Sequence, residues 1–219
     1  MKALFQCAFA LLAVMALNRA AFAADASSLK PPPGAKVAIV MFEDLECGDC
    51  ARAYPLVWEA ANAHKIPVVL HDFPLPKHNW SFKAAVYARF FDTKSQKVGN
   101  DYRGFIYQNQ SQIADEGGLQ FYTKKFADEN KVPLPFAVDP DGSLTAKVRA
   151  DYDLGQKIGL EHTPTIFVIG QGGSASTPFV EVVDRDKLTE IIEDMQRKAG
   201  PATPAKSPAA RSAAKKKAG

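Results

Sequence analysis

The stretch 37–50 reads VAIVMFEDLECGDC. Its first six residues are an unbroken apolar run, short enough for a strand that is buried on both faces. Its last four residues hold two cysteines, Cys47 and Cys50, and a helical pattern of apolar residues follows over 50–63. A cysteine pair between a buried strand and a helix is typical of redox chemistry. The stretch therefore predicts an α/β fold with reactive thiols at a strand-to-helix junction.

Further apolar runs predict the remainder of the sheet. Strands are expected at 66–73, 165–169 and 179–183, with a Gly-rich turn at 170–173. The first two strands with their intervening helix can form a parallel pair with a right-handed crossover. The turn makes the last two strands an antiparallel hairpin. Apolar residues at helical spacing predict further helices at 79–93, 100–112, 117–129, about 141–158 and 185–198.

Residues 1–23 have the features of an export signal. A lysine at position 2 precedes an apolar run over 3–17, and Ala21-Phe22-Ala23 gives a small-x-small cleavage pattern. The run is shorter than the ~20 residues that a membrane-spanning helix needs. Cys7 lies inside the signal, and the residues before it do not fit a lipoprotein signal. We therefore expect a periplasmic or otherwise exported protein with no stable membrane anchor.

The exported chain is expected to be one domain flanked by a leader and a tail. Residues 24–36 form a Pro-rich leader that we expect to join neither helix nor sheet. The domain spans 37–199, and the Ala, Pro and Lys composition of 200–219 predicts a disordered tail. Seven of the 27 basic residues lie in the signal and the tail, which leaves 20 against all 24 acidic side chains. The resulting net charge of −4 argues against a nucleic-acid partner.

The cysteine pair carries the predicted chemistry. A helix that begins beside Cys47 turns unpaired backbone N–H groups and the positive end of its dipole toward the first sulfur, which favours the thiolate. Cys47 is thus the expected nucleophile, and Cys50 the shielded resolving thiol. An inert structural disulfide is an alternative, although so short a loop restrains the unfolded chain little. A second alternative is that the two cysteines form half of a metal site, whose further ligands would come from His64, His71, His78 or His162.

Several separated motifs resemble one known family. Residues 42–50 resemble the active-site segment of the DsbA-like branch of the thioredoxin superfamily, and Pro55 matches the proline that kinks the active-site helix of thioredoxins. Residues 71–75 resemble the end of the second strand in that branch. Residues 162–168 resemble its Gly-Thr-Pro-Thr segment, in which the proline is cis and faces the cysteines. The resemblance covers roughly 35–199.

The resemblance implies a thioredoxin fold with a helical insertion, about 76–160, between the second and third strands. It implies an exported thiol–disulfide oxidoreductase that needs no cofactor or metal and acts with protein substrates and a redox partner protein. Thr163 and Pro164 would bind substrate, because a cis proline leaves the backbone of Thr163 free to pair with an extended segment. We expect a monomer, since the leader is too short for the dimerisation domain of dimeric isomerases. The alternative of another class is a metal-binding, copper-handling module on the same fold.

The chain departs from the family in the residues around the cysteines. Met41 stands where the family has a buried acid, six residues before the first cysteine. Asp49 lies between the cysteines, and Glu46 precedes Cys47. Negative charges there disfavour the thiolate, so we expect a weaker oxidant than DsbA itself, nearer ~−200 to −270 mV than ~−120 mV.

His162 replaces a glycine of the family motif. An imidazole beside the cysteines could stabilise the Cys47 thiolate or accept the proton of Cys50, and a solvent-facing loop histidine is the plain alternative. If His162 takes no part, solvent or a side chain such as Glu43 or Asp44 must accept that proton.

Overall fold

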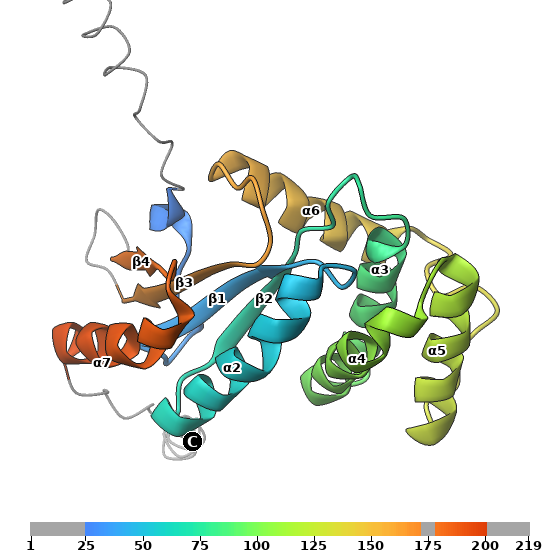
Figure 1. Ribbon diagram of the computed structural model, residues 1–219, viewed down its shortest axis with the longest axis horizontal. Coiled ribbons are helices and arrows are strands. Elements are labelled where there is room, and N and C mark those ends of the chain that lie inside the picture. Colours follow the sequence, from blue (N-terminus) through green and yellow to red (C-terminus); the bar gives the residue numbers. More distant parts are fainter. Residues whose placement is uncertain (1–24, 172–177, 201–219) are drawn as a thin grey trace, which may run out of the picture.

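A central sheet organises the molecule. The computed structural model describes residues 25–171 and 178–200, and its sheet has the strand order β2-β1-β3-β4 (Figure 1). Strand β1 pairs in parallel with β2 and antiparallel with β3, and β3 pairs antiparallel with β4. The parallel pair and the hairpin are both as predicted. The strands are β1 (Val37–Glu43), β2 (Val68–Asp72), β3 (Thr165–Gly170) and β4 (Phe179–Glu181).

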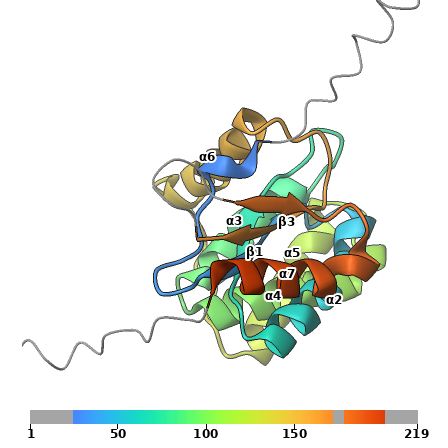
Figure 2. The same ribbon diagram turned by 90° about the vertical axis from the view of Figure 1, so that its left-hand side faces the viewer.

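Helices cover both faces of the sheet. Helices α2 (Gly48–His64) and α7 (Leu188–Ala199) lie on one face, and α6 (Ser143–Lys157) lies on the other (Figure 1, Figure 2). Every residue of β1 is buried, which explains its unbroken apolar run. Alternate side chains of β1 enter two separate cores, because successive residues of a strand point to opposite faces.

The expected helical insertion lies between β2 and β3. It contains α3 (Ser81–Asp92), α4 (Gln96–Asn109), the short 3-10 turn η2 (Gln110–Gln112), α5 (Glu116–Glu129) and α6. Helices α3, α4 and α5 lie side by side beyond the edge strand β2 (Figure 1). Gly99 allows the close approach of α3 and α4, because a Cβ at this position would lie 1.8 Å from the carboxylate of Asp92.

A buried ion network joins the insertion to the sheet. The Arg103 side chain on α4 is completely buried, and its Nε lies 2.9 Å from Glu43 Oε1 at the end of β1. Its two terminal nitrogens contact the carboxylate of Asp92 at 2.8 and 3.0 Å. Arg89 on α3 pairs with Asp72 of β2 and with Asp151 of α6. Because unpaired buried charges are costly, these pairs fix the position of the insertion against the thioredoxin-like sheet.

Two predictions need correction. The leader, expected to join neither helix nor sheet, does form a 3-10 turn at residues 26–28, and its Ala26 and Leu29 are buried in the core on the α6 side of the sheet. Both side chains are apolar, so they cover a face that the sheet would otherwise expose. Helix α4 begins at Gln96, four residues before the predicted start, because Ser95 caps it by accepting the Val98 N–H at 3.1 Å. The signal 1–23, the second half of the Gly-rich turn (172–173) and all but the first residue of the tail lie outside the described residues.

Across 25–171 and 178–200, none of the helices combines the length and the apolar character that a membrane span requires.

Candidate active site

Cys47 and Cys50 lie at the junction of β1 and α2, as predicted. Cys47 is the N-cap residue of α2, with extended backbone, and Cys50 is in the first turn. Both cysteines are free thiols, so the structure represents the reduced protein. The Cys47 side chain is partly exposed and that of Cys50 is fully buried. Only Cys47 can therefore meet a large substrate.

The surroundings of Cys47 favour its thiolate. The pKa of Cys47 is lowered to about 5, chiefly by a hydrogen bond from the Cys50 thiol. The Thr163 side chain and the backbone N–H groups of Cys50 and Asp49 also contribute, and partial burial opposes the shift. In the neutral form the Cys47 thiol donates to the Thr163 carbonyl at 3.4 Å. The backbone donors are those of the first turn of α2, where N–H groups have no partner within the helix.

Cys50 has the opposite character. Burial raises its pKa well above the usual value, and the hydrogen bond and the charge of Cys47 raise it further. The backbone N–H of Asp44 donates to the Cys50 sulfur at 3.4 Å. A low-pKa exposed thiol beside a high-pKa buried thiol is the asymmetry that disulfide exchange requires.

Thr163, followed by Pro164, faces this pair from the loop before β3. The Thr163–Pro164 peptide bond is cis. Thr163 is buried, and its carbonyl lies against the Cys47 thiol. Its backbone N–H makes no hydrogen bond to any other residue that the structure describes. The resemblance to the family thus placed the right segment opposite the cysteines, across 116 positions of sequence.

The structure neutralises Asp49, which the sequence expectation left as a bare negative charge. Arg185 Nη2 lies 2.8 Å from Asp49 Oδ1, and Arg185 Nη1 donates to the Asp49 carbonyl at 3.4 Å. Arg52 Nη2 lies 3.1 Å from the same carboxylate oxygen. The hydrogen bond from Arg185 is the main reason that the pKa of Asp49 is lowered. Arg185 is 136 positions away in sequence, so no local signal identified it.

The two acidic residues nearest Cys47 on the other side are structural. Glu46 Oε2 accepts the backbone N–H groups of Trp80 and Ser81, at 2.7 and 3.0 Å, at the start of α3. The carboxylate of Asp44 accepts from the backbone of Glu46 and Leu75 and pairs with the His78 ring. Both carboxylates are thereby compensated by donors, and they hold the active-site turn to the segment before α3.

Among the described residues, no acidic side chain forms a hydrogen bond with Cys50. Met41, at the position of the family's acid, is fully buried. Glu43 Oε2 accepts the Tyr107 hydroxyl at 2.9 Å, and burial raises the pKa of Glu43 to about 7 while Arg103 opposes the shift. Tyr107 was not identified from sequence, since its place beside β1 depends on how α4 packs.

His162 is exposed, and its side chain makes no hydrogen bond or ion pair with either cysteine in the described structure. Its backbone carbonyl accepts the Thr165 hydroxyl at 2.8 Å, which fixes the loop on the sheet side.

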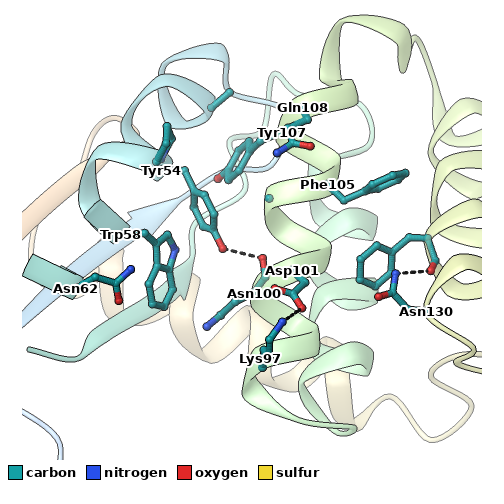
Figure 3. A pocket seen from close by; sticks show the side chains of 14 residues that line it. Tyr54, Trp58, Asn62, Lys97, Asn100, Asp101, Phe105, Tyr107, Gln108 and Asn130 are labelled. Atoms are coloured by element: carbon teal, nitrogen blue, oxygen red, sulfur yellow. Dashed lines mark hydrogen bonds and ion pairs between the residues drawn. The ribbon is translucent and has the colours of Figure 1, made fainter. Parts of the chain in front are cut away.

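A groove of about 940 Å³ runs between α2 and α4. Its lining includes Ala51, the residue that follows Cys50. Tyr54 and Trp58 from α2 face Asn100 and Asp101 from α4 across it (Figure 3). The Tyr54 hydroxyl donates to the Asn100 carbonyl at 2.7 Å. This bond ties the active-site helix to the insertion.

No group of three or more His, Cys, Asp or Glu side chains could hold a metal ion in residues 25–171 and 178–200.

Comparisons with known proteins agree with this architecture. The family model described as thioredoxin matches residues 32–194. The comparison with curated proteins gives no significant match.

Three solved structures show the likeness of the fold. The thiol-disulfide exchange protein alpha-DsbA2 from Wolbachia pipientis is 20% identical, with a TM-score of 0.57 over 76% of this chain and 86% of that one. Alpha-DsbA1 of the same organism is 17% identical, with a TM-score of 0.62 over 80% and 93%. Proteus mirabilis ScsC in a transitional conformation is 20% identical, with a TM-score of 0.58 over 90% of both chains. With the family model covering most of the sequence, the chain belongs to the thioredoxin family and has a DsbA-like fold with a helical insertion.

Proposed function

We propose that this chain is an exported thiol–disulfide oxidoreductase that exchanges disulfides with protein substrates through Cys47 and Cys50. The observation that supports the proposal most directly is the unequal pair: a partly exposed thiol with a pKa lowered to about 5 beside a buried thiol with a raised pKa. Membership of the thioredoxin family and the DsbA-type neighbours agree with it.

The exchange follows from the geometry. The Cys47 thiolate attacks one sulfur of a substrate disulfide, forming a mixed disulfide and releasing the other substrate sulfur as a thiolate, which takes up a proton. Cys50 then loses its proton and attacks the Cys47 sulfur, which forms the Cys47–Cys50 disulfide and releases the second substrate thiol. Two electrons pass from the cysteine pair to the substrate. The same steps in reverse oxidise a substrate dithiol, and the redox partner protein determines which direction operates.

Substrate recognition is proposed at the loop opposite the cysteines. An extended substrate segment would add to the loop by pairing with the backbone of Thr163, beside Pro164. The free backbone N–H of Thr163 supports this, because a donor without a partner can donate a hydrogen bond to a substrate carbonyl. The location proposed for this exchange is the periplasm or another exported compartment, on the strength of the signal features in 1–23.

Trapping tests the proposal. In the Cys50→Ala variant the mixed disulfide cannot be resolved, so Cys47 should capture substrate proteins in complexes that dithiothreitol releases. The reduced wild type should also accelerate insulin reduction. The matched control is Cys47→Ala, which should do neither. Preferential alkylation of Cys50 in the native reduced protein, or complexes formed through Cys50, would contradict the assigned roles.

A further inference from the structure

We propose that Arg185 raises the reduction potential of the cysteine pair by neutralising Asp49, and so acts as a positioning residue for the disulfide exchange proposed above, on which this inference rests. Asp49 is the one charged residue between the two cysteines. Its backbone N–H is among the donors that stabilise the Cys47 thiolate, whereas its carboxylate carries a charge of the same sign as that thiolate.

Arg185 contacts both the carboxylate and the backbone carbonyl of Asp49. One terminal nitrogen pairs with the carboxylate at 2.8 Å, and the other donates to the backbone carbonyl at 3.4 Å. The first contact offsets the negative charge. The second contact holds the peptide group between Asp49 and Cys50. The N–H of that peptide group, which belongs to Cys50, is also one of the donors to Cys47. A single side chain therefore controls the charge and the orientation of the dipeptide.

Arg52 contacts the same carboxylate but is the weaker candidate. Its side chain is 71% exposed, against 31% for Arg185, and it lies three residues further along the same helix. Exposed pairs of this kind are screened by solvent and contribute little. Arg185 instead comes from the 3-10 turn η3 (Arg185–Lys187) that precedes α7, on the C-terminal side of the fold. The active-site dipeptide is thus tied to the end of the domain.

The direction of the effect follows from the redox states. The thiolate exists only in the reduced protein, so a positive charge that offsets Asp49 stabilises the reduced state relative to the disulfide. The other carboxylates near the pair, Glu46 and Asp44, are already held by backbone donors of the segment before α3. Loss of Arg185 therefore leaves Asp49 with the solvent-exposed Arg52 as its remaining partner, which makes it the most weakly compensated of these charges.

The test is the equilibrium with glutathione, in which the protein dithiol and glutathione disulfide exchange with the protein disulfide and two molecules of glutathione. Arg185→Gln should favour the protein disulfide by about three- to tenfold, the range for one unit charge at ~6 Å with solvent screening. The thiolate absorbance of Cys47 should titrate at a correspondingly higher pH. Arg185→Lys, which keeps the charge, should recover most of the wild-type equilibrium.

A double-variant cycle separates this role from a merely structural one. If Arg185 acts through Asp49, Arg185→Gln should have a much smaller effect in an Asp49→Asn background. The control Arg197→Gln removes a surface arginine that pairs with Asp194 in the last turns of α7, and it should leave the equilibrium unchanged. An unchanged equilibrium in Arg185→Gln, or an equal effect in both backgrounds, would overturn the inference. A wild type that does not exchange with glutathione at all would instead overturn the proposed function.

Discussion

The stability of the reduced protein should depend on pH through Cys47, and Cys47→Ser isolates this dependence. The pKa of the Cys47 thiol falls from an ordinary value of 9.0 to about 5 in the folded protein. A group whose folded pKa is depressed contributes stability that is fully present above its unfolded pKa and is lost as pH falls through its folded pKa. The relevant window is therefore between about pH 5 and pH 9.

The magnitude follows from the same two values. Each pH unit between the folded and unfolded pKa is worth about 1.4 kcal/mol, so at pH 7 the thiolate contributes about 2 to 3 kcal/mol. The difference in unfolding free energy between reduced wild type and Cys47→Ser should grow by that amount from pH 5 to pH 7. For the two-electron couple of Cys47 and Cys50, the same free energy raises the reduction potential of the pair by roughly 40 to 65 mV.

Urea unfolding of both reduced proteins across pH 4 to 8 measures the difference, and every other titrating group cancels because both proteins contain it. The same measurement on Cys50→Ala is a second test. This variant lacks the Cys50 thiol, whose hydrogen bond is the largest cause of the lowered Cys47 pKa, so the increase of stability with pH should move to higher pH. A wild-type minus Cys47→Ser difference that does not change with pH would refute the reasoning. So would a thiolate absorbance that titrates near pH 9.

Three further outcomes concern the structure around the site. Glu43→Gln should remove a pH dependence of stability opposite in sign to that of Cys47, because burial raises the folded pKa of Glu43 from 4.5 to about 7. The stability that Glu43 contributes is complete below pH 4.5 and declines by up to about 3 kcal/mol as pH rises through 7. Urea unfolding of both proteins at each pH measures this decline. Arg103→Met should lower the unfolding free energy by about 3 to 5 kcal/mol because it leaves buried carboxylates unpaired, whereas the exposed Lys97→Met should change it by less than about 1 kcal/mol; equal losses would contradict the network's role. Tyr54→Phe should cost about 1 kcal/mol by breaking the bond to Asn100 between α2 and α4, and a stability equal to that of the wild type would show that water replaces that bond.

The potential expected from the sequence, nearer ~−200 to −270 mV than ~−120 mV, rested on Asp49 and Glu46 as charges without partners. The folded protein provides a partner for each. A Cys47 pKa of about 5 lies between the ~7 of thioredoxin and the ~3.5 of DsbA, so these partners act in the more oxidising direction, and the potential itself stays a prediction.

Local patterns predicted the sheet, the redox pair and the hairpin, because periodicity and turn residues act over a few positions. The cap of α4 was also local, and Ser95 could have identified it. Arg185 and Tyr107 are different, since they reach the site only through the packing of helices far along the chain. The burial of Ala26 and Leu29 likewise depends on a sheet face that the sequence does not reveal.

The buried charges have a consequence for how the sequence can evolve. Arg103 on α4 pairs with Glu43 of β1 and Asp92 of α3. The side chains of Arg103 and Glu43 are fully buried and that of Asp92 is only 14% exposed, so solvent screens little of the loss of a partner. Replacing one member of this group leaves a buried charge without its partner, whereas replacing all of its members by apolar residues would leave no such charge. Relatives should therefore keep these positions charged as a set or lose them as a set. An alignment in which arginine at 103 varies independently of the acids at 43 and 92 would contradict that coupling.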